Sequence, residues 1–235
     1  MRVIICFEKR PSVRNVSHLD QMRAMQRALR RAGLPLRYSN GFNPHPILAF
    51  ASALSVGTAS MGEIMDVGLA EELSPQDCLE ALGGALPAGY RAVDALALPD
   101  DAPGLMGLTE AADYVAILER PAADLGQRVA DLLAQPSALV EKQGKMGHKK
   151  GIRQLDIRPL IQDLRAQGED TLAMRLALSG AGSAHPAQVA QCLGMPLKTI
   201  TRTAILARDG EALLPMMDML RARQARHEQK FDIFH

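Results

Sequence analysis

The sequence predicts an α+β protein made of two similar halves in tandem. In several stretches apolar and polar residues alternate, which is typical of β-strands. Between these stretches lie predicted helices that begin immediately after a serine. The order of these elements starts again after residues 100–107, a segment that holds one proline and two glycines. Hydrophobic residues make up 47% of the 235 residues, which is enough for a packed core, although only 3% are aromatic.

The first half is predicted to have six elements in the order β-α-β-β-α-β. A strand at 2–8 precedes a helix that Ser17 caps and that ends at Gly33. Ser74 caps a second helix, which has a proline at its first position and ends at two glycines. The other expected strands of this half are 47–55, 63–69 and 91–98.

The second half repeats this pattern with an additional pair of strands. Its expected strands are 111–119, 137–142, 152–157, 171–178 and 198–207, and its expected helices are 121–134 and 186–193. We therefore expect two ferredoxin-like (βαββαβ) halves, at 1–99 and 108–210. The remaining segment, 211–235, is expected to be a terminal helix or a basic tail.

Cysteine usage and the absence of targeting signals favour a cytoplasmic protein. Cys6, Cys78 and Cys192 are far apart in the sequence, so neither a zinc knuckle nor an iron–sulfur motif is present. The N-terminus does not resemble a signal peptide, and no run of eighteen apolar residues occurs. Because nucleotide-binding glycine motifs are also missing, we expect no cofactor and no bound metal.

Charge is segregated along the chain although the net charge is only +1. Residues 9–37 contain eight basic side chains and one acidic one, whereas 63–113 contains eleven carboxylates and one arginine. Residues 142–165 are basic again, with seven basic and two acidic side chains, and include a glycine-rich loop. Such segments are often solvated surface, but two separate basic runs favour binding of a polyanion such as RNA.

The residues expected to bind RNA belong to two groups. Arginines at i, i+4 and i+7 of the first helix and the cations of the basic loop would contact phosphate, and aromatic and amide side chains after the helix would contact bases. These residues are Arg23, Arg27, Arg30, Tyr38, Phe42, Asn43, Lys145, Lys149, Lys150 and Arg153. Phe42 could equally fill a core position beneath its loop.

Two histidines in polar loops are candidates for catalysis. His18 opens the first helix and His45 lies between two prolines, so a loop that folds back would let them act as acid and base. Asp20 could join them as a metal ligand. The alternative is structural, because Ser17 and Asp20 are explained as helix caps and the prolines stiffen the loop around His45.

Several short stretches together resemble one bacterial family. They are residues 17–20, 28–35, 38–46 and 57–66, followed by 149–150 and 156–159. In this combination they are similar to the radical-SAM-linked protein family, a domain of unknown function. The resemblance is specific over about residues 1–70 and looser as far as 165.

The resemblance implies a partner and suggests RNA. Members of the family are encoded beside, or fused to, a radical SAM protein with a cobalamin-type region, and in some bacteria they lie near genes for ribonuclease E/G and ribosomal proteins. No activity or catalytic residue comes with the resemblance. This chain lacks the three clustered cysteines of a radical enzyme, so any radical step would belong to the partner.

We expect a non-catalytic accessory protein that binds RNA, such as tRNA or rRNA, and presents it to a radical SAM partner. The first alternative is a metal-independent RNA endonuclease that uses His18 and His45. In outline, paired ferredoxin-like halves are similar to the CRISPR RNA-processing endonucleases. The second alternative is a pure protein-interaction module in which the acidic stretch 63–113 binds the partner.

Overall fold

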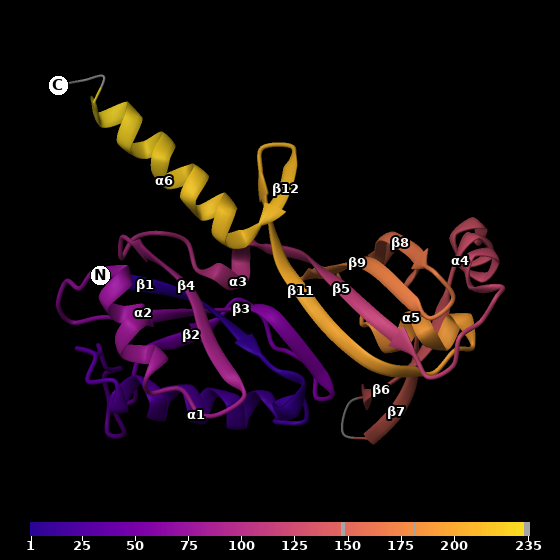
Figure 1. Ribbon diagram of the computed structural model, residues 1–235, viewed down its shortest axis with the longest axis horizontal. Coiled ribbons are helices and arrows are strands. Elements are labelled where there is room, and N and C mark those ends of the chain that lie inside the picture. Colours follow the sequence, from indigo (N-terminus) through magenta and orange to yellow (C-terminus); the bar gives the residue numbers. More distant parts are fainter. Residues whose placement is uncertain (147–148, 181, 233–235) are drawn as a thin grey trace. The chain divides into compact units, whose positions relative to one another are not determined.

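The computed structural model describes residues 1–146, 149–180 and 182–232, and it describes side chains outside 142–153 and 227–235. The protein is a mixed α/β protein with a large mixed sheet and, in the described residues, six α-helices. It divides into two compact units (Figure 1). Unit 1 comprises Met1–Glu110 and Arg202–His235, and unit 2 comprises Ala111–Thr201.

In unit 1 the strand β1 (Arg2–Lys9) lies at the centre of an antiparallel sheet. It pairs with β4 (Tyr90–Leu98) on one side and with β3 (Thr58–Gly68) on the other. The short β2 (Leu48–Phe50) pairs with one end of β3, and β11 (Leu197–Asp209) is also a neighbour of β3. The remaining elements are η1 (Pro11–Val13), α1 (His18–Arg31), α2 (Pro75–Gly83), α3 (Leu105–Leu108), β12 (Ala212–Pro215) and α6 (Met216–Asp232).

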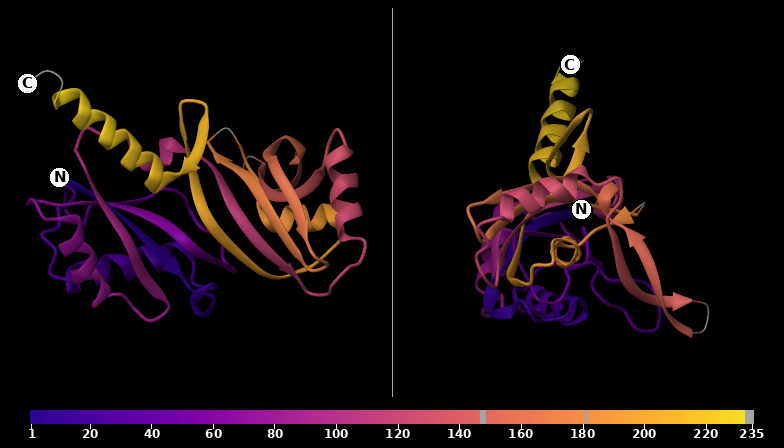
Figure 2. Two further views of the ribbon diagram at one scale, coloured as in Figure 1. Left: turned by 45° about the horizontal axis from the view of Figure 1, so that its top comes forward. Right: turned by 90° about the vertical axis from the view of Figure 1, so that its right-hand side faces the viewer.

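Helices cover both faces of this sheet (Figures 1 and 2). The alternating pattern of β1 sends Ile5 and Phe7 to the face where α1 and α2 contribute Met25 and Leu82. Ile4 points to the opposite face, into a second core that is formed with the first turns of α6. Helix α1 therefore buries one side and exposes the other to solvent.

Unit 2 contains further strands of the large sheet and has its own core. β5 (Thr109–Leu118) pairs with β9 (Thr171–Ser179), and β9 pairs in turn with β8 (Ile161–Gln167). β11 follows β5 on its other side, and the division between the units falls within these two strands. The further elements are α4 (Leu125–Ala134), the hairpin β6 (Leu139–Met146) and β7 (Lys149–Asp156), η2 (Arg158–Leu160), β10 (Gly182–Ser183) and α5 (Pro186–Leu193).

Several local predictions are confirmed, and two strands were not predicted. The hydroxyls of Ser17 and Ser74 accept hydrogen bonds from the third residue of their helices, as predicted for caps. β8 was not predicted, because a register shift between Ile161 and Asp163 breaks its alternation. Residues 212–215 form a strand rather than helix, because Gly210, at a φ of +61°, lets β11 turn back on itself.

The predicted domain bounds 1–99, 108–210 and 211–235 remain a prediction about which segments fold on their own. In the structure, residues 202–210 belong to the same compact unit as residues 1–110.

A buried cluster of charges lies at one end of the sheet of unit 1. Arg202 is fully buried and donates to both carboxylate oxygens of Glu63, over 2.8 and 2.5 Å, and to the hydroxyl of Ser52. Lys9, 1% exposed, donates to the carbonyl oxygens of Arg14 and Val16. Burial lowers the pKa of Lys9, although the nearby Glu63 acts in the opposite direction. This cluster attaches β11 and the segment before α1 to the sheet.

Replacing the carboxylate of this cluster should destabilise the fold. E63Q removes the carboxylate to which the buried guanidinium of Arg202 donates, so we expect a loss of about 3–5 kcal/mol in the free energy of unfolding. Urea denaturation measures it. The double variant E63Q/R202M should recover part of the loss, because it removes the buried cation together with its carboxylate. A loss below about 1 kcal/mol in E63Q would contradict a structural role for the pair.

Candidate nucleic-acid interface

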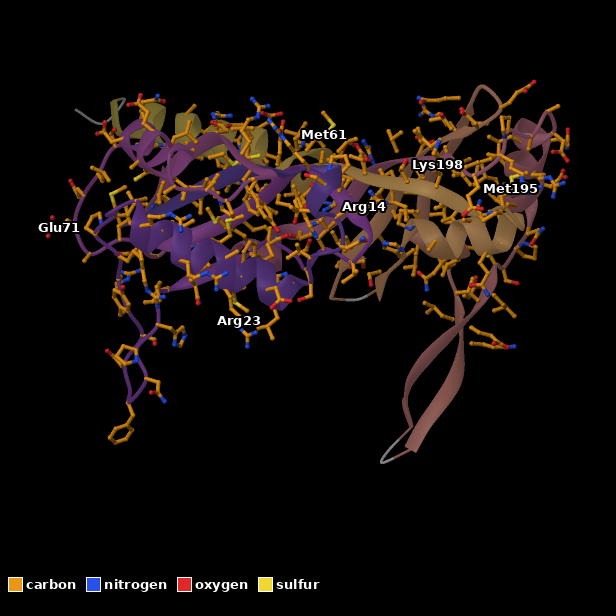
Figure 3. The ribbon with its side chains drawn as sticks, turned by 60° about the horizontal axis from the view of Figure 1, so that its bottom comes forward. Arg14, Arg23, Met61, Glu71, Met195 and Lys198 are labelled. Carbon is orange, nitrogen blue, oxygen red and sulfur yellow. The ribbon has the colours of Figure 1, made fainter. Side chains whose placement is uncertain are left out.

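The exposed face of α1 carries a row of arginines. Met25, Ala28 and Leu29 are buried in the core, whereas Arg23, Arg27 and Arg30 are exposed. The arrangement follows from helical periodicity, because the two sets occupy different stripes of the same 14-residue helix. Arg23 points away from the body of unit 1 (Figure 3). We call Arg23, Arg27 and Arg30 the arginine row.

Two members of the arginine row, Arg27 and Arg30, are less engaged than the other guanidinium groups of segment 9–37. Arg23 is 3.5 Å from the exposed Asp20. Within the residues that the structure describes, Arg27 and Arg30 have no ion-pair partner. Elsewhere in the segment Arg37 pairs with Asp100 over 2.9 Å. The other basic groups form internal contacts: Lys9 as above, Arg10 with Glu8, Arg14 with the carbonyl of Pro11, and Arg31 with the carbonyl of Ala85.

The acidic stretch 63–113 is largely neutralised. Six of its eleven carboxylates form ion pairs with arginines that lie far away in the sequence. The pairs are Glu63–Arg202, Asp66–Arg2, Asp94–Arg221, Asp100–Arg37, Glu110–Arg208 and Asp113–Arg175. The stretch is therefore less of a free negative surface than its composition suggests.

The segment that follows α1 forms a closed hairpin loop, which we call the 38–46 loop. The amide of Ser39 donates to the carbonyl of His45 over 2.9 Å, and Tyr38 bridges to Pro46. Gly41 provides the turn at a φ of +124°, a conformation that other residues rarely adopt. Phe42 is fully exposed beside it, so the expectation that it might fill a core position is wrong.

The two candidate catalytic histidines have different surroundings. The ring of His18 packs edge-on against Phe50 with 5.2 Å between ring centroids, and its Nδ1 is buried without a hydrogen-bond partner in the part of the chain that the structure describes. Nδ1 of His45 lies 2.9 Å from the hydroxyl of Ser39, which also accepts from the backbone amide of His45. None of the described contacts joins the two imidazoles, and their catalytic role remains a prediction.

Sequence reasoning missed Gln21, which lies one turn after His18. Gln21 is 1% exposed, and neither its amide oxygen nor its amide nitrogen has a partner among the described residues. A buried polar group without a hydrogen bond costs stability, so packing alone would favour an apolar residue at this position of α1. The sequence signal that could have revealed its burial is the helical spacing of the apolar residues, which places Gln21 on the buried face of α1.

The basic loop of unit 2 belongs to the β6–β7 hairpin, whose backbone pairs Lys142 with Arg153. The side chains of Lys145, Lys149, Lys150 and Arg153 lie outside the described residues. The base of the hairpin is described. There Oδ1 of Asp156 accepts from the backbone amides of Ala138 and Arg158, over 2.8 and 3.0 Å. These two hydrogen bonds lower the pKa of Asp156.

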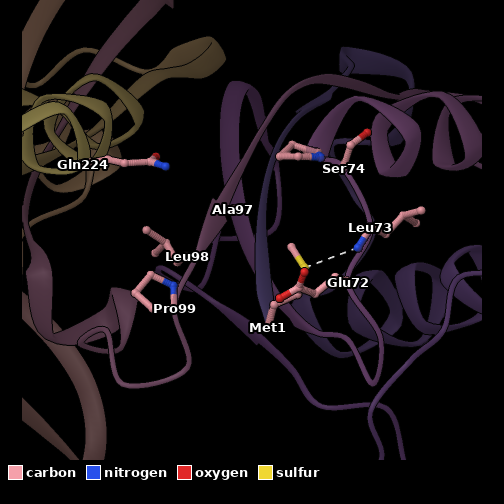
Figure 4. A pocket seen from close by; sticks show the side chains of 9 residues that line it. Met1, Glu72, Leu73, Ser74, Ala97, Leu98, Pro99 and Gln224 are labelled. Carbon is pink, nitrogen blue, oxygen red and sulfur yellow. Dashed lines mark hydrogen bonds between the residues drawn. The ribbon is translucent and has the colours of Figure 1, made fainter. Parts of the chain in front are cut away.

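Unit 1 also contains an open pocket of about 530 Å³ (Figure 4). Its lining residues include Met1, Leu73, Ser74, Leu98, Pro99 and Gln224. The amide of Leu73 donates to the sulfur of Met1, and Ser74 is engaged with Asp77 as the cap of α2. Glu72 adds negative charge. The lining of this pocket therefore does not suit a phosphate group, whereas the arginine row does.

Among the described residues, no group of three or more His, Cys, Asp and Glu side chains is placed to hold a metal ion. In the same part of the chain, no helix is long and apolar enough to cross a membrane. All three cysteines are free thiols.

Comparison with known proteins identifies a family. A family model described as "Uncharacterized protein conserved in bacteria (DUF2344)" matches residues 2–186. The chain belongs to this family. No curated protein matches the sequence.

Among solved structures, a chain in "Crystal Structure of a Cbf5-Nop10-Gar1 Complex" is similar at 10% identity and a TM-score of 0.45. The match covers 86% of this chain and 48% of the other, so the present chain spans about half the length of the chain that it matches.

The carboxylate at the base of the hairpin should make stability depend on acidity. Because the folded-state pKa of Asp156 is lowered, its contribution is present above its unfolded pKa of about 3.9 and is lost as the pH falls further. D156N keeps the accepting oxygen without the charge and should lose less stability below this pH than the wild type. D156A should be destabilised at neutral pH as well. Urea unfolding from pH 3 to 7 tests this, and identical wild-type and D156N profiles would contradict it.

The thiol of Cys6 should be unreactive in the folded protein. Burial, together with Asp94 and Glu63, raises its pKa to about 12. In C78S/C192S, where Cys6 is the one thiol left, labelling by a thiolate-specific reagent at pH 8.5 should be slow and should become fast in denaturant. Because the folded pKa is raised, the stabilising contribution is full below about pH 8.5 and is lost as the pH rises. Fast labelling of the native protein at pH 8.5 would refute the burial of this group.

Proposed function

We propose that the protein is a non-catalytic accessory protein that binds RNA through α1 and the 38–46 loop. The observation that carries the proposal is the arginine row, in which Arg27 and Arg30 have no ion-pair partner among the described residues. Free guanidinium groups can bind phosphate without first breaking an internal pair. They also release the counterions condensed on a nucleic acid, which is the main source of affinity for its backbone.

The geometry of α1 supports this role. Positions 23, 27 and 30 extend over about 10.5 Å along a helix that rises 1.5 Å per residue. Met25 and Leu29 hold the helix in the core, and the Ser17 hydroxyl caps its first turn. The row is therefore held on a rigid support, so little conformational entropy of the backbone is lost when RNA binds.

The 38–46 loop would supply the contacts to bases. Tyr38, Phe42, Asn43 and His45 offer two aromatic rings, an amide and an imidazole, which are groups that stack on bases or bond to their edges. Lys145, Lys149, Lys150 and Arg153 of the β6–β7 hairpin remain a proposed second set of phosphate contacts, since their side chains lie outside the described residues.

We also propose that the protein presents RNA to a radical SAM partner. This part of the proposal rests on the resemblance of the sequence to the radical-SAM-linked protein family. A cytoplasmic location is proposed from the three free thiols, which suit a reducing compartment. The endonuclease that uses His18 and His45 stays a prediction. The third possibility, a pure interaction module, loses support because most carboxylates of 63–113 are already paired.

We also propose that both units are ferredoxin-like. The order β4-β1-β3-β2 with α1 and α2 in unit 1 supports this, as does β11-β5-β9-β8 with α4 and α5 in unit 2. On this reading the β6–β7 hairpin is an insertion in the second half.

Removing the two free arginines should weaken RNA binding in a salt-dependent way. For a single-stranded RNA, each lost phosphate contact lowers the slope of log K against log salt by about 0.7, so R27Q/R30Q should reduce the slope by about 1.4. Fluorescence anisotropy over a salt series measures this. The control R128Q/R165Q removes the same charge from arginines that pair with Asp124 and Asp163. Equal slopes for R27Q/R30Q and the wild type would refute the proposal.

A further inference from the structure

The 38–46 loop is a built structure rather than a loose connection. Besides the Ser39–His45 hydrogen bond, the amide of Ile47 donates to the carbonyl of Arg37 over 2.8 Å. The amide of Arg37 in turn donates to the carbonyl of Gly68, at the end of β3. The base of the loop is thus joined to the sheet, and its tip is held out in a defined conformation.

The tip presents an aromatic ring where no apolar neighbour shields it. Phe42 is fully exposed, and Tyr38 at the base of the loop is 43% exposed. Exposure of a large aromatic side chain on a structured turn contributes nothing to packing. It is explained if the ring contacts something outside this chain.

The chemistry of the loop indicates which part of a nucleic acid it contacts. Residues 38–46 include no Lys, Arg, Asp or Glu, so the loop has no means of holding phosphate by charge. Its side chains instead offer rings, amides, a hydroxyl and an imidazole. Nδ1 of His45 is engaged with Ser39, and Nε2 makes none of the described contacts. These groups suit the faces and edges of bases.

The loop and the arginine row lie on the same side of unit 1. Residues 32–37 connect α1 to the loop, and Leu34 and Leu36 of this connection are buried in the same core as Met25 and Leu29 of the helix. In Figure 3 the loop extends on the side of unit 1 toward which Arg23 points. One strand of RNA can therefore contact the row with its phosphates and the tip with a base.

We infer that the protein recognises unpaired nucleotides: Phe42 stacks on a base of single-stranded RNA whose neighbouring phosphates bind the arginine row. The inference rests on the proposed function and narrows its substrate class. In a duplex each base is already stacked between its neighbours and paired, so its face is closed to the ring. The tip then adds affinity for single strands and none for duplexes.

Binding of two matched probes by the full-length chain tests the inference. The probes are a 12-nucleotide single-stranded RNA and the blunt duplex of the same sequence. F42A and F42L should weaken binding of the single strand about five- to hundredfold, the range that one base–aromatic stack provides, and should leave duplex affinity unchanged. F42W should retain the affinity. F42L is the decisive control, because it keeps an apolar side chain but removes the aromatic face.

An RNA with abasic nucleotides identifies the contact more directly. If Phe42 stacks on a base, F42A and the wild type should bind the fully abasic strand equally, and the wild type should bind this strand at least as weakly as F42A binds the normal strand. Because Phe42 is fully exposed, all of these variants should unfold at the wild-type temperature.

The outcomes separate the inference from the proposed function. Equal binding of the single strand by F42A and the wild type overturns the inference, while an altered salt slope in R27Q/R30Q still supports RNA binding. Full affinity in F42L also overturns it, because the ring then serves as an apolar contact, as it would against a protein. Unchanged slopes in R27Q/R30Q refute the proposed function itself.

Discussion

The arrangement of unit 1 depends on a buried ion pair between residues that are 139 positions apart. The side chain of Arg202 on β11 reaches the carboxylate of Glu63 on β3, and its backbone carbonyl accepts from Ser60. Lys9 lies in the same interior and holds the carbonyls of Arg14 and Val16, immediately before the cap of α1. These buried charges thus fix β11 and the backbone immediately before α1 to the sheet.

Local signals were sufficient for much of the fold. A serine before a helix, a glycine after it, and apolar residues at helical spacing act within a few residues, so α1, α2 and α5 could be predicted from the sequence. β8 escaped prediction because its register shift is a property of the pairing with β9, not of its own sequence. For the same reason the strand at 212–215 was visible only once β11 was known to turn at Gly210.

The position of the candidate interface could be predicted from the sequence, but which of its charges remain unpaired could not. Helical spacing alone puts Arg23, Arg27 and Arg30 on one stripe. Which cations remain free depends on partners from elsewhere in the chain, as when Arg37 meets Asp100. The sequence pattern counts Lys9 and Glu63 as surface charges, although both are buried. Nor can it decide between burial and exposure for Phe42, because the closure of the 38–46 loop rests on backbone hydrogen bonds.

A net charge near zero is compatible with binding a polyanion when most charges cancel in pairs. Paired carboxylates and arginines contribute little field beyond their immediate surroundings, so the potential near α1 is set by the few cations left unpaired. At physiological salt the screening length is about 8 Å, so charges that lie farther than this from the arginine row contribute little to the potential there. Counterion release at the phosphates that the row contacts, rather than the overall charge of the protein, is then the quantity that determines affinity.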